Sequence, residues 1–272
     1  LFTHFARPDS PGVAVGLLHR GRVLHKSCYG MADIAHGVPL AADSVIRIGS
    51  QTKQFTVLLA LMLEAEGTLS MDDEVHRYLS WLPAFEAPVT LRHLATNTGG
   101  LRDFLEALGY SGVSIAGPST REFARQVIAH QVDLNFRPGD ALIYCNTGFF
   151  LLADVVELVS GRGFDELLQE RICIPLGMSD TRLMTRDSDI LPRLAVHHTR
   201  GADGRWSRAS WGIPLGGEGG MVSTLDDMLR WQANFHDPKI GSQKLFARMA
   251  TPPAYSNGAT SPYAMGLVSG AY

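Results

Sequence analysis

The chain has 272 residues, of which 45% are hydrophobic and 19% are charged, and its formal net charge is −3. This length and composition suit one large domain or two lobes with an ordinary hydrophobic core. The slight negative charge and the lack of any run of Lys or Arg argue against nucleic acid as a partner.

The first predicted elements are β-strands. Apolar and β-branched runs at 12–19 and 22–29 flank the pair Arg20-Gly21, a pattern that predicts a β-hairpin. A short strand at 45–48 follows and leads directly into an apolar segment.

That apolar segment is predicted to be a buried helix, and its first turn carries Ser50 and Lys53. Residues 55–63 are apolar nearly all round, and Gly67 suits the position just after a helix end. Residues three apart share a helix face, so the two side chains should be neighbours. Burial favours neutral lysine, and a neutral amine beside a serine hydroxyl can generate a nucleophile without histidine.

Ser-x-x-Lys alone is weak evidence, because a chain of this length carries about one such pattern by chance. The pattern occurs once here, at the start of a predicted buried helix. A second motif is therefore needed to support a catalytic interpretation.

The stretch from 69 to 177 is predicted to be mostly helical and looks like a helical lobe inserted into an α/β lobe. We expect three parts: 1–68 with the nucleophile helix, the helical lobe 69–177, and a return to the α/β lobe over 178–272. The expected helices are a short one capped by Ser70 or Asp72, one capped by Thr90 that includes His93 as a capping or packed residue, and others from Ser119 or Thr120 to His130, from Thr147 to Val159 and from Phe164 to Ile172.

The C-terminal third begins with a long polar segment. Residues 185–211 have no clear period and are predicted to form a loop. The glycine-rich run 216–220 precedes a predicted helix over 225–235 and matches neither nucleotide-binding pattern, so we expect no cofactor. The run is either backbone packed close to a site or a tight turn.

A second motif, Tyr144-x-Asn146, stands just before the helix predicted from Thr147. Tyr144 and Asn146 are either helix caps or site residues. A further Tyr-x-Asn at Tyr255 lies in a Pro-, Gly- and Ser-rich surface loop and is interpreted as a chance match.

Taken together, these motifs resemble the class C β-lactamase and penicillin-binding-protein family. Within it, the likeness is greatest to D-aminopeptidase and D-amino acid amidase members, although esterases of the fold share the same two motifs. The segments that carry the resemblance are Ser50-x-x-Lys53-Gln54-Phe55-Thr56, Arg92 to Leu101, Gly100-Leu101-Arg102-Asp103, Pro138-Gly139, Tyr144-Cys145-Asn146 and Gly219 to Met228.

The resemblance implies an α/β (α+β) fold, with an antiparallel sheet flanked by helices and an inserted helical lobe. It also implies site roles: Ser50 as nucleophile, Lys53 as base or proton acceptor, Tyr144 as proton shuttle, and Asn146 as the residue that orients Lys53 and the substrate amide. Whether Lys53 or Tyr144 takes the Ser50 proton stays open, because coupled groups can share it.

One family motif is missing from the sequence. A Lys-Thr-Gly or His-x-Gly strand should follow Gly219-Gly220, and none occurs there; His19-Arg20-Gly21 has the form but lies in the first hairpin. Half of the oxyanion hole normally comes from that strand. We therefore expect further C-terminal sequence, either in the same chain or as a second fragment of the same precursor, that completes the sheet and covers the apolar Ser50 helix.

The leading functional prediction is a serine hydrolase that forms an acyl-enzyme at Ser50 and cleaves D-aminoacyl amides, short peptides or esters. A penicillin-recognising D,D-carboxypeptidase or β-lactamase is the second prediction. A catalytically incomplete binding homologue is the third. An α/β-hydrolase is disfavoured because no Gly-x-Ser-x-Gly occurs.

The remaining composition bears on metals and compartment. Ten scattered His without His-Glu-x-x-His predict no metal site, and three Cys favour a reducing compartment. No apolar run is long enough to span a membrane, and no signal peptide is visible. We predict a cytoplasmic protein, or a periplasmic or secreted one if a signal peptide has been removed.

Overall fold

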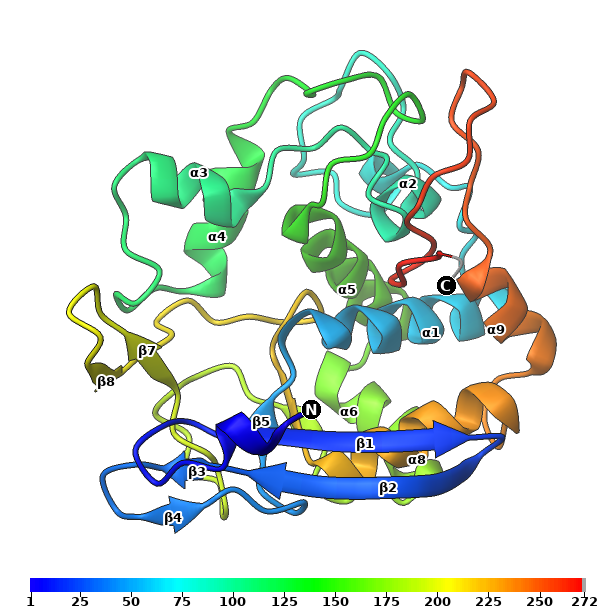
Figure 1. Ribbon diagram of the computed structural model, residues 1–272. Coiled ribbons are helices and arrows are strands. Elements are labelled where there is room, and N and C mark those ends of the chain that lie inside the picture. Colours follow the sequence, from blue (N-terminus) through cyan, green and yellow to red (C-terminus); the bar gives the residue numbers. More distant parts are fainter. Residues whose placement is uncertain (271–272) are drawn as a thin grey trace.

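The computed structural model describes residues 1–270 (Figure 1). Its helices are α1 (Thr52–Ala65), α2 (Leu91–Ala95), α3 (Phe104–Tyr110), α4 (Arg121–Ala129), α5 (Asn146–Ser160), α6 (Phe164–Leu168), α7 (Ile174–Leu176), α8 (Leu225–His236) and α9 (Gln243–Ala250). Its strands are β1 (Val13–His19), β2 (Arg22–Tyr29), β3 (Met31–Asp33), β4 (Val38–Pro39), β5 (Ile46–Arg47), β6 (Arg182–Leu183), β7 (His198–Arg200), β8 (Trp206–Arg208) and β9 (Met221–Ser223).

The predicted hairpin is confirmed as the antiparallel pair β1–β2. Helix α8 packs against β1, behind the hairpin in Figure 1. Gly16 makes this approach possible, because a Cβ there would lie 2.8 Å from the Leu229 side chain. Within residues 1–270, β2 is the only strand that pairs along β1.

A second, three-stranded sheet leads into the first helix. Strand β9 is antiparallel to both β5 and β6 in the order β5-β9-β6. The Ile48 N–H extends this pairing by donating to the Met221 carbonyl at 3.1 Å. The end of the glycine-rich run therefore lies beside the start of α1.

The predicted buried helix is confirmed, and it lies at the centre of the hydrophobic core with α5 beside it. Phe55 on α1 stacks on Trp231 of α8 with ring centroids 4.1 Å apart, and α9 covers a further part of α1. The expectation that this helix would lack cover was wrong, because α5, α8 and α9 already enclose it. The core includes residues from all three predicted parts, so the division at 68 and 177 stays a prediction.

Three predicted elements differ from the structure. The short helix after Ser70 is a 3-10 turn, Val75–Arg77, which neither Ser70 nor Asp72 caps. The Ser70 N–H donates to Asp73 Oδ2 at 2.8 Å and its hydroxyl accepts from the Asp72 N–H, so these side chains hold a separate turn. The segment 185–211 is not all loop, since it contains the hairpin β7–β8. The helix predicted over 164–172 is α6 followed by a π-helical turn, Gln169–Cys173.

Among residues 1–270 there is no helix with the length and apolar character that crossing a membrane requires.

Candidate active site

The short turn before α1 presents Ser50 to solvent, and the first turn of α1 buries Lys53. Gly49 precedes the serine with φ +52, in the left-handed region that favours glycine. A short 3-10 turn, Gly49–Gln51, then runs into α1. Because Lys53 lies one turn further on, it shares the face of Ser50 but lies inside the core, with none of its surface exposed.

The Lys53 amine has three oxygen partners around it. Nζ donates to Ser50 Oγ at 3.1 Å, to Asn146 Oδ1 at 2.8 Å and to the Glu218 carbonyl at 2.5 Å. Three donated hydrogen bonds match the three N–H groups of the ammonium form, which is therefore held in one position next to the serine hydroxyl. The structure thus brings together residues 50, 53 and 146, which the sequence placed up to 96 positions apart.

Tyr144 completes the group with a second hydrogen bond to Ser50. Its hydroxyl donates to Ser50 Oγ at 2.5 Å, and the centroid of its ring lies 4.8 Å from Lys53 Nζ. The ring also meets Tyr263 edge-on, with centroids 6.2 Å apart. Ser50 Oγ therefore lies between an amine and a phenol, each within hydrogen-bond distance.

Asp103 fixes the segment that carries Tyr144 and Asn146. One carboxylate oxygen caps α3 by accepting from Leu105 N–H at 2.9 Å, and the other accepts from the Asn146 N–H at the start of α5. Thr147 adds a second hydrogen bond between the two segments, because its hydroxyl accepts from Phe104 N–H at 2.9 Å. The loop before α3 and the N-terminus of α5 are thereby joined at the site.

The environment shifts the pKa values of the two proton carriers in opposite directions. Burial lowers the pKa of Lys53 to about 8, against the raising effect of the Glu218 and Asp103 carboxylates. Burial raises the pKa of Tyr144, and its hydrogen bond to Ser50 opposes that rise. At neutral pH the tyrosine stays a phenol, whereas part of the lysine is a neutral amine.

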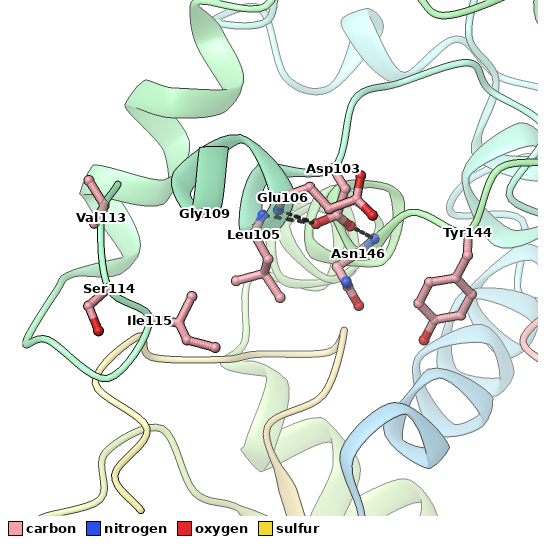
Figure 2. A pocket seen from close by; sticks show the side chains of 9 residues that line it. All are labelled: Asp103, Leu105, Glu106, Gly109, Val113, Ser114, Ile115, Tyr144 and Asn146. Carbon is pink, nitrogen blue, oxygen red and sulfur yellow. Dashed lines mark hydrogen bonds between the residues drawn. The ribbon is translucent and has the colours of Figure 1, made fainter. Parts of the chain in front are cut away.

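A cavity of about 470 Å³ opens beside these residues (Figure 2). Leu105, Val113 and Ile115 form its apolar wall. Asp103 and Glu106 line the same cavity, together with Tyr144 and Asn146 (Figure 2). The cavity has room for a small organic group next to Tyr144 and Asn146.

Two residues at the site were not assigned roles from the sequence. Asp103 belongs to the quoted segment Gly100 to Asp103, but its spacing gives no sign of a double capping role. Glu218 is a single acidic residue inside a glycine-rich run, and this isolated charge is the sequence feature that could have pointed to a role at the site. His19-Arg20-Gly21 lies at the turn of the β1–β2 hairpin, as expected.

Comparison with known proteins shows the family. A family model described as β-lactamase matches residues 2–272. A D-aminopeptidase from Gluconobacter oxydans (strain 621H) is 31% identical over 263 residues, which cover 96% of this chain and 49% of that protein. The chain therefore spans about half the length of the curated relatives it matches.

Solved structures agree with this relationship. The octameric penicillin-binding protein homologue from Pyrococcus abyssi matches with a TM-score of 0.80 and 25% identity, covering 96% of this chain and 61% of that one. D-amino acid amidase from Ochrobactrum anthropi SV3, in complex with D-phenylalanine, matches with a TM-score of 0.75 and 27% identity, covering 94% and 76%. The predicted fold class is confirmed, and the chain belongs to the β-lactamase family.

Proposed function

We propose that this protein is a serine hydrolase that forms an acyl-enzyme at Ser50 and cleaves D-aminoacyl amides, short peptides or esters. One observation carries the proposal: Ser50 Oγ receives hydrogen bonds from both Lys53 Nζ and the Tyr144 hydroxyl. A serine between a partly neutral amine and a phenol has both a proton acceptor and a proton donor at hand.

Acylation follows from this arrangement. Neutral Lys53 accepts the Ser50 proton while Oγ bonds to the substrate carbonyl carbon. When the tetrahedral intermediate collapses, the leaving amine takes the Tyr144 proton, and the Lys53 ammonium returns a proton to Tyr144. The lowered pKa of Lys53 and the raised pKa of Tyr144 support lysine as the initial acceptor.

Deacylation uses the same groups in reverse. A water molecule loses its proton to Lys53 as its oxygen attacks the acyl carbon, and the proton then returns to Ser50 Oγ as the acid leaves. Asn146 Oδ1 and the Glu218 carbonyl hold the ammonium during both halves. No metal or cofactor takes part in this proposal.

The adjoining cavity favours a substrate with a free amino group. Glu106 is exposed, and within residues 1–270 its carboxylate forms no ion pair, so it can receive an ammonium group. Leu105 and Ile115 give the substrate side chain an apolar surface. The names of the relatives, D-aminopeptidase and D-amino acid amidase, support the D configuration.

Intact mass spectrometry tests the nucleophile. We expect a fluorophosphonate to add one adduct to the protein, mapped to Ser50, and no adduct in Ser50→Ala. Lys53→Ala should slow labelling by several orders of magnitude. A persistent adduct in Ser50→Ala at another residue would overturn the assignment.

Substrate class is tested separately. D-phenylalanine amide should be hydrolysed faster than L-phenylalanine amide and faster than N-acetyl-D-phenylalanine amide. Acylation by penicillin with no turnover of amides would favour the penicillin-recognising alternative. A protein with no turnover and no adduct would be a binding homologue.

A further inference from the structure

The glycine-rich loop 216–220 holds a buried glutamate directly behind the candidate site. Two residues of α1, one turn apart, bind this loop: Lys53 Nζ donates to the Glu218 carbonyl, and Thr56 Oγ1 donates to the Gly217 carbonyl at 2.7 Å. The side chain of Glu218 is 1% exposed. The proposed mechanism uses only its backbone oxygen.

The carboxyl group of Glu218 is incompletely satisfied. Oε1 accepts from Gly216 N–H at 2.9 Å, so the side chain folds back on its own loop. Oε2 is buried and has no hydrogen-bond partner among residues 1–270. A buried polar atom without a partner destabilises the fold, and an apolar residue at this position would avoid that cost.

Burial raises the pKa of the Glu218 carboxyl, and the positive charges of Arg121 and Lys53 oppose that rise. Arg121 packs on this loop, since a Cβ on Gly216 would lie 2.2 Å from its Nη1. Arg121 is itself paired, donating to Asp154 Oδ1 at 2.6 Å.

An anionic Glu218 supplies a counter-charge to the cations beside it. Asp154 accepts hydrogen bonds from both Arg121 and Arg125, so one carboxylate serves two guanidinium groups. Asp103 is the other carboxylate that acts on Lys53, so an anionic Glu218 gives three anions for the three cations. The titratable groups that act on Lys53 or Glu218 are Arg121 on α4, Asp103 before α3, and Tyr144 and Cys145 before α5. Asp154 and Glu157 on α5 act on Arg121, and Arg125 on α4 shares Asp154.

We propose that Glu218 is a positioning residue whose buried carboxylate stabilises the ammonium form of Lys53 from behind, while its loop carbonyl fixes where that ammonium points. This inference rests on the proposed function, in which Lys53 gains and loses a proton in each half-reaction. The anion makes Lys53 a stronger base than burial alone would allow, so the lysine can hold the proton that it takes from Ser50.

The pH dependence of Ser50 labelling by a fluorophosphonate tests the role. The labelling rate of the unaltered protein should rise with pH as Lys53 loses its proton. Glu218→Gln removes the negative charge but keeps the shape, so the lysine pKa should fall and the rise should move to lower pH by about one unit. A rise that coincides with that of the unaltered protein would overturn the proposal.

Glu218→Met is a second neutral variant, since replacing a buried charge by an apolar group of similar volume is often tolerated. It should show the same downward shift, and an unshifted rise would again contradict the role. Thr56→Val loosens the same loop without changing charge, so it should lower the melting temperature but leave the midpoint of the rise in place. A midpoint shift in Thr56→Val equal to that in Glu218→Gln would assign the effect to loop geometry instead.

This test of Glu218 can fail independently of the proposed function, because the fluorophosphonate reports on Ser50 whatever the natural substrate is. No labelling of the unaltered protein would overturn both proposals. Labelling without hydrolysis of D-aminoacyl amides would overturn only the substrate assignment and leave the test of Glu218 valid.

Discussion

One carboxylate oxygen of Asp103 accepts a hydrogen bond from the backbone N–H of Asn146, while the other oxygen caps α3. This single side chain satisfies N–H groups at the starts of two helices, and one of those helices carries a candidate site residue. Helix capping and site geometry are therefore coupled at Asp103.

Asp103→Ala should reduce both stability and acylation. The two helix starts lose their shared acceptor, which should lower the free energy of unfolding by about 2 kcal/mol. Asn146 then loses its fixed position beside Lys53, so fluorophosphonate labelling should slow at least about tenfold. Thr120→Ala is the matched control: it removes the cap that accepts from Phe123 N–H on α4 and should cost stability without slowing labelling. Equal labelling rates in the two variants would show that Asp103 is only a cap.

Tyr144→Phe separates the hydroxyl from the ring. The ring keeps its edge-on contact with Tyr263, so the melting temperature should hardly change. Loss of the proton donated to Ser50 Oγ should lower turnover at least ~10²-fold, as expected for a general acid–base group. Tyr255→Phe, in the other Tyr-x-Asn copy, should leave turnover unchanged. Full turnover in Tyr144→Phe would favour the alternative in which Tyr144 is only a structural residue.

The sequence predicted the elements whose signal is local. The buried helix after Ser50, the β1–β2 hairpin and the cap at Thr90 were all identified, and His93 has the capping role expected of it, accepting from Thr90 N–H at 3.2 Å. Each depends on apolar periodicity, turn residues or cap chemistry within a few positions.

Other features were hidden because they depend on distant contacts. The role of Asp103 requires the N-terminus of α5 to lie next to it, 43 residues away. The burial of Glu218 depends on α1 and Arg121, and nothing in a glycine run reveals it. Helix α9, which covers α1, was not predicted although its signal is local: Ser242 caps it by accepting from the Leu245 N–H, and Phe246 and Met249, three residues apart, are buried. The hairpin β7–β8 was missed because its short strands are largely exposed and polar.

The pH dependence of the reaction should follow Lys53. Its pKa is lowered to about 8 by burial, so kcat/KM should rise with pH towards that value as the amine becomes neutral. Asn146→Asp places a carboxylate where Oδ1 now accepts from Nζ at 2.8 Å. The added carboxylate stabilises the ammonium form, so the lysine pKa rises. The rise of kcat/KM should therefore move to higher pH, the opposite of the shift expected for Glu218→Gln. Asn257→Asp adds the same charge on a surface loop and should leave the pH of this rise unchanged. A rise in Asn146→Asp at the same pH as in the unaltered protein would argue against Lys53 as the titrating base.

Glu106→Gln tests the recognition of a free amine. Glu106 lines the cavity beside Tyr144, and removing its charge should reduce kcat/KM for D-phenylalanine amide about tenfold, the lower range for a hydrogen bond to a charged group. An ester substrate without an amino group should be cleaved at the same rate by both proteins. Glu122→Gln, an exposed carboxylate on α4, is the control and should not affect either substrate. Equal losses on both substrates would show that Glu106 acts on the site rather than on the amine.

Gly217→Ala tests how closely the glycine-rich loop is packed against α1 and α5. A Cβ at this position would lie 2.7 Å from Ala153 Cβ and 2.7 Å from Thr56 Oγ1, so backbone or helix must shift. The free energy of unfolding should fall by about 1–3 kcal/mol, as for other overpacked sites, and displacement of the adjoining Glu218 carbonyl should slow Ser50 labelling. Gly163→Ala has no atom within 4 Å of its new Cβ and φ −63, so it should change stability by less than about 0.5 kcal/mol and leave labelling unaffected. If Gly217→Ala behaves like Gly163→Ala in both measurements, the loop is not held tightly enough to aim Lys53, and the positioning role of its carbonyl fails with it.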